Sequence, residues 1–225
     1  MGKSHLSEED IKLRYITPAI QNAGWDNKQI RMEYAFTAGR IILRGNITAR
    51  GRKKSADYLL SYKNNFPLAI VEAKDNTQPV GAGLQQAIDY AKALDVPYVY
   101  ASNGDGFVEQ NLITGEVKEL KLEEFPSPEA LYQRYRIDKG IDEAEEKVML
   151  EPYYYIPNYK TPRYYQRVAI NRAVDAVAKG QNRVLVVSAT GTGKTYMTFQ
   201  MIYRLWKSGL KKKILFLADR NVLID

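Results

Sequence analysis

Three charged residues on two neighbouring apolar segments have the types and spacing for phosphodiester chemistry. Asp57 lies at the start of the segment 56–62, and Glu72 and Lys74 lie at the end of the segment 66–74. Side chains alternate along a strand, so Glu72 and Lys74 share a face while the residues between them point into the core. Buried charges are costly unless they are paired or bound to a metal. If the two strands pair, Asp57 approaches Glu72.

Two converging carboxylates favour a divalent cation, although a salt bridge at a sheet end is the plainer alternative. The cation removes the repulsion between Asp57 and Glu72, and it generates a nucleophile from water. Lys74 would lower the pKa of that water or stabilise the pentavalent phosphorane. We therefore predict a Mg²⁺ site at Asp57 and Glu72, with Lys74 as a third catalytic residue.

A basic segment precedes this group. It carries six basic residues and no acid, in a chain with a net charge of +7: Arg40, Arg44, Arg50, Arg52, Lys53 and Lys54. Such a local positive field favours a polyanion such as DNA, whereas the plainer alternative is a solvated hairpin. We assign the DNA contacts to Arg50, Arg52, Lys53 and Lys54.

A second candidate site lies in the C-terminal part of the sequence. The run Ser188-Ala-Thr-Gly-Thr-Gly-Lys-Thr195 follows an apolar segment and precedes an amphipathic one. Glycines allow backbone N–H groups to converge on phosphate oxygens, and a helix N-terminus adds partial positive charge. Lys194 would reach the β- and γ-phosphates of ATP, and the Thr195 hydroxyl would coordinate Mg²⁺. The strict phosphate-loop pattern expects Gly where Ser188 stands, and helicase-type loops are relaxed at that place.

Upstream of this loop, Gln166 follows the sequence Pro-Arg-Tyr-Tyr. A glutamine amide can read both the donor and the acceptor on an adenine edge. The predicted ATP site comprises Gln166, Gly191, Thr192, Gly193, Lys194 and Thr195.

Apolar periodicity predicts the elements that position these residues. Ser7 is a suitable N-cap for a helix over 7–23, which Pro18 interrupts or kinks and Gly24 ends. The order helix, three strands, helix, strand predicts an α/β core with a mixed sheet, and the later order strand, loop, helix, strand is a β-α-β unit. The other predicted elements are strands over 40–48, 56–62, 66–74, 97–101, 107–112, 116–120, 183–187 and 213–218, and helices over 83–94, from 127, over 166–179 and over 194–208.

The combination of motifs resembles a known family. Asp57, followed fifteen residues later by Glu72-x-Lys74, resembles the PD-(D/E)XK nuclease signature, with Ala56 in place of the family's proline. Gln86 and Tyr90, one helical turn apart, resemble the Q-x-x-x-Y element of the restriction (R, HsdR-type) subunits of type I restriction–modification enzymes. The aromatic–Gln element and phosphate loop resemble superfamily 2 helicase-like motors. The R-subunit family joins a nuclease domain to such a motor in this order.

The resemblance implies a PD-(D/E)XK nuclease-like mixed sheet flanked by helices over 1–137, a linker over 138–160, and the first strands of a RecA-like parallel α/β domain over 161–225. Because a parallel α/β domain cannot close on two strands, we expect the sequence to be part of a longer protein with an incomplete ATPase here.

The implied activity is Mg²⁺-dependent cleavage of double-stranded DNA, coupled in the complete enzyme to ATP-driven translocation, with methylation and specificity subunits as partners. Gln86 and Tyr90 would act near the scissile DNA. Whether Glu8 or Glu9 adds a metal carboxylate is left open, because two adjacent acids near a terminus are usually solvated. Two alternatives stay open. One is a superfamily 2 helicase whose nuclease-like domain only holds DNA, and the other is a DNA-binding or assembly module with a vestigial phosphate loop.

The composition excludes several other classes of protein. The chain has no cysteine and one histidine, His5, which excludes disulfide scaffolds, cysteine zinc sites and multi-histidine metal sites. Its 45% hydrophobic and 26% charged residues are typical of a globular protein. No apolar run approaches the ~18 residues of a membrane span, and MGKSHLSEED lacks the apolar core of a signal peptide. We therefore expect a cytoplasmic protein without a membrane partner.

Overall fold

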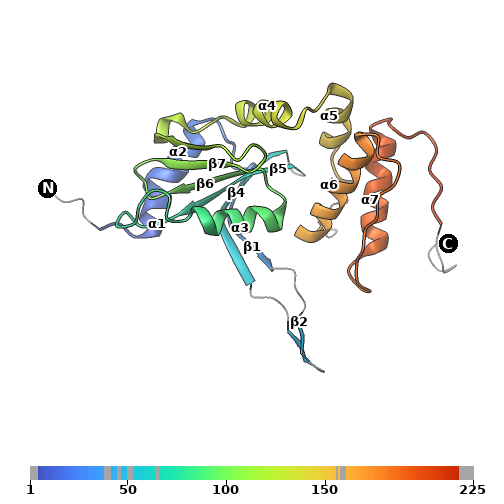
Figure 1. Ribbon diagram of the computed structural model, residues 1–225, viewed down its shortest axis with the longest axis horizontal. Helices are drawn as coiled ribbons and strands as arrows, with labels where there is room; N and C mark the ends of the chain where they lie inside the picture. Colours follow the sequence, from blue (N-terminus) through green and yellow to red (C-terminus); the bar gives the residue numbers. More distant parts are fainter. Residues whose placement is uncertain are drawn as a thin grey trace. The chain divides into compact units, whose positions relative to one another are not determined.

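The computed structural model in Figure 1 describes residues 5–37, 42–44, 47–49, 53–63, 66–155, 157 and 161–217, with the backbone alone for 42–44 and 47–49. The chain divides into two compact units, Met1–Ile141 and Asp142–Asp225, which are described in turn. Of the predicted DNA-binding residues, Arg50 and Arg52 lie outside the described residues, as do residues 40, 41, 45 and 46 of the predicted strand 40–48.

The N-terminal unit contains a six-stranded mixed sheet in the order β1-β4-β5-β6-β7-β8. Neighbouring strands are antiparallel except β5 and β6, which are parallel and are connected through the helix α3 (Leu84–Leu94). The predicted mixed sheet is thus confirmed. The strands are β1 (Ile30–Thr37), β4 (Lys53–Lys63), β5 (Phe66–Ala73), β6 (Tyr98–Ser102), β7 (Phe107–Asn111) and β8 (Val117–Leu120), with a separate hairpin of β2 (Ile42–Arg44) and β3 (Ile47–Ala49).

The central strand β5 is buried on both faces, as its continuous apolar sequence predicts. Leu68, Ala69, Ile70 and Val71 are all fully buried. Figure 1 shows α3 on one face of the sheet and α2 (Thr17–Asn22) with α4 (Pro128–Lys139) on the other. A polar residue on β5 is therefore enclosed between a helix and the neighbouring strands.

The first helical segment differs from the single kinked helix predicted over 7–23. It consists of α1 (Glu8–Ile11), a π-helical turn η1 (Lys12–Ile16) and α2. Ser7 caps α1 as predicted, because its Oγ accepts from the N–H of Asp10 at 3.2 Å. Pro18 has no N–H and lies at the start of α2, and the wider π turn before it lets the N–H of Thr17 donate to the carbonyl of Lys12.

The edge strand β1 was not predicted from the sequence. Its signal is present as a period-two alternation of Ile30, Met32, Tyr34 and Phe36 with less apolar residues. The register pairs Met32 with Tyr58 and Tyr34 with Ala56 on β4. This strand carries a functional side chain described below.

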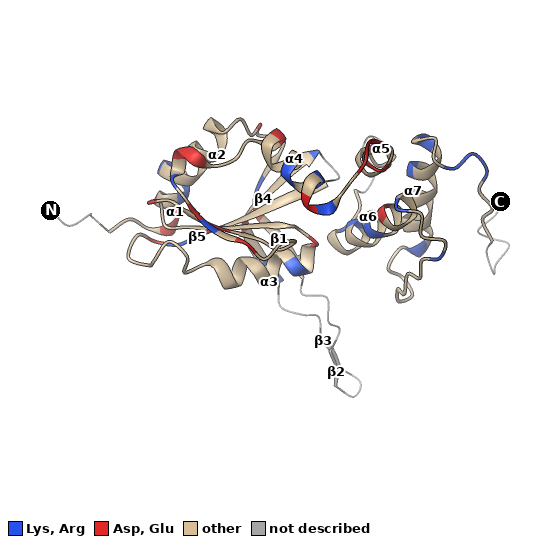
Figure 2. Ribbon diagram, turned by 45° about the horizontal axis from the view of Figure 1, so that its top comes forward, with Lys and Arg blue, Asp and Glu red and all other residues tan. Residues whose placement is uncertain are grey.

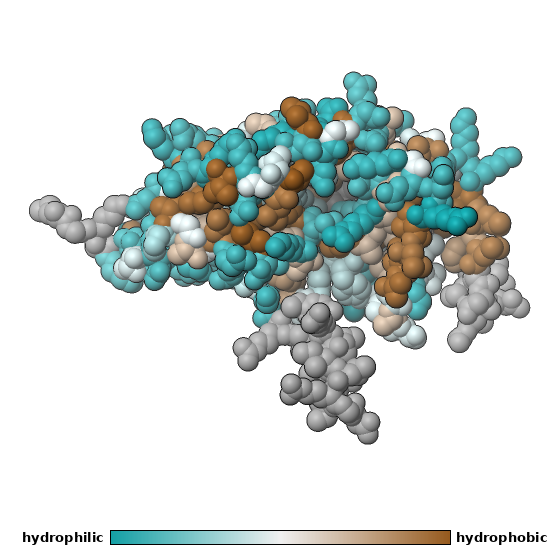
Figure 3. Space-filling view, in the orientation of Figure 1, coloured by the Kyte–Doolittle hydropathy of each residue, from teal (hydrophilic) through white to brown (hydrophobic). Residues whose placement is uncertain are grey.

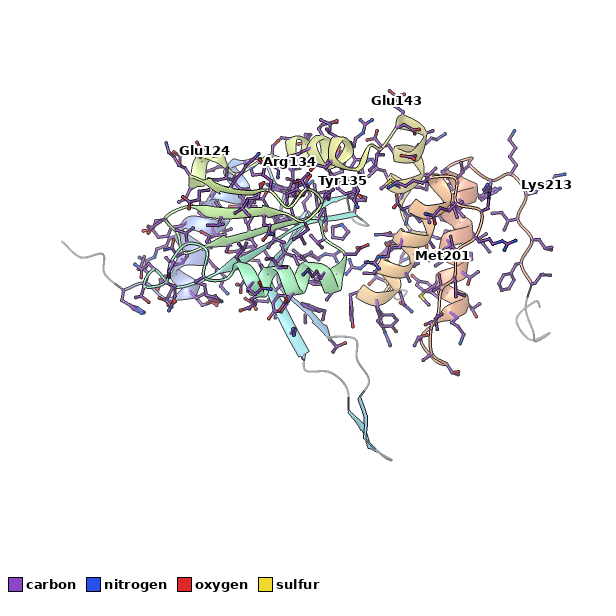
Figure 4. All side chains as sticks on the ribbon, viewed as in Figure 1. Glu124, Arg134, Tyr135, Glu143, Met201 and Lys213 are labelled. Carbon is purple, nitrogen blue, oxygen red and sulfur yellow. The ribbon has the colours of Figure 1, made fainter. Side chains whose placement is uncertain are left out.

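A buried ion pair attaches α4 to the sheet. Arg134 Nη2 donates to Glu109 Oε2 on β7 at 2.8 Å, and the hydroxyl of Tyr100 on β6 lies 2.5 Å from the same oxygen. The Glu109 side chain is 2% exposed, and Figure 4 places Arg134 on α4 beside the sheet. The helix begins at its predicted N-cap, because Ser127 Oγ accepts from the N–H of Ala130 at 3.1 Å. A short 3₁₀ turn, η2 (Leu122–Glu124), precedes it.

The described part of the C-terminal unit contains three helices, α5 (Glu143–Leu150), α6 (Tyr164–Ala178) and α7 (Lys194–Lys207). The boundary between the units falls inside the predicted linker 138–160, of which α5 occupies the middle. Met201, labelled in Figure 4, packs against the small core of this unit, which comprises Val148, Ile170, Val174 and Met197.

The predicted strands over 183–187 and 213–218 are not formed in the part of this unit that the structure describes, where 183–187 and 213–217 have no regular structure. Leu185 is 87% exposed and Leu215 is 82% exposed. A strand needs a neighbouring strand to satisfy its N–H and C=O groups, and no such pairing occurs among the described residues here. Figure 3 shows the resulting hydrophobic surface, in brown, on this unit. None of the described helices could span a bilayer.

We expect Arg134→Met to destabilise the N-terminal unit by about 3 kcal/mol, because it leaves the Glu109 carboxylate buried without its cation. The double variant Glu109→Gln/Arg134→Met removes both charges and should recover much of the loss. The measurement is urea denaturation followed by tryptophan fluorescence in a Trp206→Phe background. Buried Trp25 is then the single tryptophan left in the sequence shown, so the fluorescence reports on the N-terminal unit.

The matched control is Lys139→Met, an exposed cation in the last turn of the same helix, which should leave the midpoint unchanged. If Arg134→Met and the double variant unfold at the same urea concentration, Glu109 does not need Arg134 for its burial, and the assigned role of this ion pair is wrong.

Candidate functional site

Strand pairing brings Asp57 and Glu72 together. The β4–β5 register pairs Tyr58 with Val71, which places the two acids side by side on the same face. The backbone N–H of Asp57 lies 3.3 Å from Glu72 Oε1, and the backbone N–H of Ala73 donates to Asp57 Oδ2 at 2.8 Å. Each carboxylate is thus held by the backbone of the neighbouring strand.

Glu72 is an unusually buried acid, with an exposed fraction of 1%. Its Oε2 accepts from Gln86 Nε2 at 2.8 Å. Burial and, next, the negative charge of Asp57 raise the pKa of Glu72 to about 8. A carboxyl in this environment ionises readily at neutral pH only when a further positive charge reaches it.

The helix α3 approaches the acids closely because Gly83 precedes it. A Cβ at this position would lie 3.2 Å from Glu72 Cβ and 3.5 Å from Lys74 Cε. The close approach brings Gln86 over Glu72. Gln86 Nε2 also donates to the Tyr90 hydroxyl at 3.2 Å, so the two residues share a helix side as predicted.

Tyr90 connects this group to the basic end of β4. Lys54 Nζ lies 5.2 Å from the centroid of the Tyr90 ring, and the ring of Phe36 meets the same ring edge-on at 5.1 Å. Lys53, the next predicted DNA-binding residue, is exposed at the first position of β4. The structure therefore places Lys54 beside Tyr90, with Lys53 next to it at the start of β4.

Lys74 lies beside Glu8, one of the two acids considered above as an additional metal ligand. Its Nζ is 3.7 Å from Glu8 Oε2, and its side chain is about one quarter exposed. Burial and then the charge of Asp57 raise the pKa of Glu8. Glu9 instead contacts Lys12, at 2.7 Å.

Two members of this group, Lys12 and Glu33, were not predicted from the sequence. Lys12 Nζ lies 3.2 Å from Asp57 Oδ1 and 2.8 Å from Glu33 Oε1. Burial alone would lower the pKa of Lys12, but hydrogen bonds to Glu33 and Glu9 raise it well above its ordinary value. Helical spacing does not indicate that the Lys12 side chain points inward. Glu33 could not be placed beside Asp57, because the strand β1 that carries it was not predicted.

The donors at Asp57 and Glu72 are hard carboxylate oxygens, which suit Mg²⁺. Within the described ranges, no group of three or more Asp, Glu, His or Cys side chains is arranged to hold a metal ion. Mg²⁺ usually keeps several waters and takes one or two protein carboxylates together with substrate phosphates. The pair fits that mode of binding rather than a closed protein cage.

The glycine-rich run forms a compact loop before α7. Gly191 and Gly193 have left-handed φ angles of 79° and 86°, which favour glycine. Thr192 Oγ1 hydrogen-bonds to Ser188 Oγ and donates to the carbonyl of Ala189 at 2.6 Å. Lys194 Nζ lies 3.3 Å from the carbonyl of Ser188, across the loop. Lys194 and Thr195, both exposed, open the helix.

Gln166 is packed against this loop. Its Nε2 donates to the carbonyl of Thr192 at 2.8 Å, and its Oε1 accepts from the N–H of Arg163 at 2.8 Å. A Cβ on Gly193 would lie only 2.5 Å from Gln166 Nε2. The amide therefore holds the loop in this structure, and its predicted contact with adenine stays a prediction.

Comparison with known proteins gives two family matches. The family described as "Type I restriction enzyme R protein N terminus (HSDR_N)" matches residues 7–126, more than half of the chain. The family described as "Type III restriction enzyme, res subunit" matches residues 159–225. The two matches coincide with the two groups of residues described above.

Individual relatives agree with these matches. The chain is 51% identical over 230 aligned residues to the type I restriction enzyme EcoAI endonuclease subunit of Escherichia coli, covering all of this chain and 28% of that protein. It is 26% identical to the EcoKI endonuclease subunit of Escherichia coli K12, covering 97% of this chain and 23% of that protein.

The fold also matches a solved structure, the fragment of a putative HsdR subunit of a type I restriction enzyme from Vibrio vulnificus YJ016. The TM-score is 0.79 and the sequence identity is 42%, and the match covers 92% of this chain and 39% of that one. The chain thus spans well under half the length of the relatives that it matches. It belongs to the family of type I restriction enzyme R (HsdR-type) subunits and corresponds to the N-terminal region of that family.

Proposed function

We propose that the N-terminal unit cleaves double-stranded DNA at Asp57, Glu72 and Lys74. The observation that carries the proposal is the buried Asp57–Glu72 pair, which lies beneath Gln86 and beside Lys74. A buried pair of acids that merely supported the fold would be expected to have a closely bonded cation at each carboxylate. Glu72 is met instead by neutral donors, the N–H of Asp57 and the amide of Gln86.

Asp57 and Glu72 would hold Mg²⁺, with Glu8 as the nearest additional acid. The ion supplies a Lewis acid for the scissile phosphate and lowers the pKa of water. Lys74 would stabilise charge that develops on the phosphate, since its ammonium is partly exposed beside the acids. Gln86 keeps Glu72 oriented and has one further amide oxygen for the phosphate or for water.

The DNA backbone would approach along the basic side of this site. Lys53 and Lys54 open β4, and Lys54 lies over Tyr90, whose hydroxyl already contacts Gln86. Arg50 and Arg52 precede them in the sequence and would extend the same contact. Such phosphate contacts position DNA without reading its sequence, so recognition would fall to specificity and methylation subunits in an assembled enzyme.

The C-terminal unit would begin the ATP-driven motor. The loop over 188–195 would bind the phosphates of ATP, Lys194 would contact the β- and γ-phosphates, and Thr195 would hold the accompanying Mg²⁺. We propose a nuclease domain over 1–137, a linker over 138–160 and the start of the motor domain from 161. ATP hydrolysis would drive translocation of DNA in the full-length protein.

We expect Asp57→Asn, Glu72→Gln and Lys74→Met each to lower DNA cleavage by the assembled enzyme on the order of a thousandfold, the scale of a lost acid–base or charge-stabilising group. ATP hydrolysis should continue, because the phosphate loop is untouched. Cleavage of an unmethylated circular plasmid and phosphate release are measured on the same samples.

The control for this experiment is Asp89→Asn, which removes an exposed acid on α3 that contacts Gln85 instead of the site. Normal cleavage by all three site variants would eliminate the nuclease proposal and favour a motor whose nuclease-like domain only holds DNA.

Gln86 and its sequence neighbour Gln85 provide a matched pair on one helix. Gln86 contacts Glu72 and Tyr90, whereas Gln85 contacts Asp89. We expect Gln86→Ala to lower the cleavage rate about tenfold to a hundredfold, as loss of an orienting group does, and Gln85→Ala to have no effect. Single-turnover cleavage measures both, and equal rates for the two variants would remove Gln86 from the site.

Lys194→Ala should abolish ATP hydrolysis and translocation by the full-length protein, because the phosphates lose their ammonium contact. Translocation is followed by displacement of a triplex-forming oligonucleotide from DNA. Lys207→Ala, at the exposed end of the same helix, is the control. Unaltered ATP hydrolysis in Lys194→Ala would point to the vestigial-loop alternative.

A further inference from the structure

Lys12 is a lysine buried among acids from three elements. It is 2% exposed, and lysine is almost never so buried unless it is paired. Its Nζ lies 2.7 Å from Glu9, 2.8 Å from Glu33 and 3.2 Å from Asp57, with Glu8 at 4.0 Å. One ammonium therefore joins α1, β1 and β4.

Two local irregularities of the backbone converge on this ammonium. Lys12 is the first residue of the π-helical turn η1, and such turns are frequent at functional sites. Glu33 has a left-handed φ of 48°, a strained conformation for a residue with a Cβ. Backbone strain of this kind persists where surrounding contacts hold it, and here the Glu33 carboxylate is bonded to Lys12.

The sheet register explains why a cation is needed here. Met32 pairs with Tyr58 and Tyr34 with Ala56, so Glu33 falls opposite Asp57. Like charges directly across two strands are destabilising. Lys12 Nζ contacts one oxygen of each and thereby neutralises a cross-strand pair of acids.

The two sides of Asp57 are consequently different. On the side of β1, its Oδ1 meets the fixed ammonium of Lys12. On the side of β5, its Oδ2 accepts from a backbone N–H, and the neighbouring carboxylate of Glu72 meets neutral donors. A mobile divalent cation is attracted to the side of Asp57 that Lys12 does not occupy, where Glu72 adds a second carboxylate.

We propose that Lys12 is a positioning residue for DNA cleavage: a built-in cation that fills the Glu9–Glu33 side of Asp57 and confines the divalent ion to the Glu72 side. The proposal rests on the proposed nuclease function. Without Lys12, the acids Glu9, Glu33 and Asp57 would face one another uncompensated. A divalent cation would then bind among them and draw Asp57 away from Glu72.

The test compares Lys12→Met, Lys12→Arg and Lys12→Met/Glu33→Gln in the full-length protein. Binding of Mn²⁺ without nucleotide or DNA is measured from the electron paramagnetic resonance signal of the free ion, and Mg²⁺-dependent cleavage is measured in the assembled enzyme. Lys12→Met should bind one more Mn²⁺ than the parent protein, or the same number about tenfold more tightly, while its maximal cleavage rate falls about tenfold or more.

Rescue separates positioning from mere support of the fold. Lys12→Arg keeps the charge and should retain the Mn²⁺ stoichiometry of the parent protein together with most of the cleavage rate. Lys12→Met/Glu33→Gln removes the uncompensated acid along with the ammonium, so the extra Mn²⁺ should be lost and cleavage should partly recover. Because this double variant leaves no unpaired charge at Glu33, it keeps the test decisive if Lys12→Met folds poorly.

Arg14→Met is the matched control. Arg14 lies on the same helical segment and pairs with Asp10, but its side chain is 58% exposed. It should change neither Mn²⁺ binding nor cleavage. The proposal is overturned if Lys12→Met folds and binds Mn²⁺ as the parent protein does, whatever its cleavage rate, or if the double variant binds and cleaves no differently from Lys12→Met.

Asp57→Asn distinguishes this failure from failure of the proposed function. If Asp57→Asn loses a Mn²⁺ and Lys12→Met behaves as the parent protein, only the role of Lys12 falls. If Asp57→Asn binds Mn²⁺ and cleaves as the parent protein does, the nuclease function itself falls, and the inference about Lys12 falls with it.

Discussion

The N-terminal unit is organised around two carboxylates that lie side by side inside a sheet. Two unit charges about 4 Å apart repel by roughly 4 kcal/mol at the effective dielectric of a protein surface, and burial adds several kcal/mol for each ion. The raised pKa of Glu72 is the direct expression of both costs. A fold that keeps such a pair must bring compensating donors from elements that are distant in the sequence.

Each neighbouring element supplies part of that compensation. The backbone of β4 and β5 donates to both acids, α3 supplies the amide of Gln86, and η1 supplies the ammonium of Lys12. Figure 2 shows the acidic and basic residues of this end of the unit gathered around α1 and the adjoining strands. Gly83 belongs to the same scheme, because a Cβ there would lie 3.2 Å from Glu72 Cβ and would require a small shift at Glu72.

The sequence predicts those site residues whose orientation follows from the periodicity of their own strand or helix. Asp57, Glu72 and Lys74 are readable because strand periodicity fixes their face, and Gln86 and Tyr90 because helical periodicity fixes theirs. The strands from β4 to β8 follow from apolar runs and turns. Lys12 and Glu33 are not readable in this way, since their roles depend on a π turn, a left-handed residue and an edge strand whose contacts are set only in three dimensions.

The phosphate loop presents the opposite case, because most of the contacts that shape it lie within a few consecutive residues, with Gln166 as a partner from outside the motif. The glycines with positive φ, the Thr192 contacts and the helix start at Lys194 all lie within the motif. The flanking apolar segments were predicted as strands, but an apolar segment becomes a strand only when a neighbour accepts its hydrogen bonds. Leu185 and Leu215 are therefore exposed here although the loop between α6 and α7 is formed. Local chemistry and local backbone geometry can be read from sequence, whereas sheet pairing and charge compensation depend on partners that the motif does not contain.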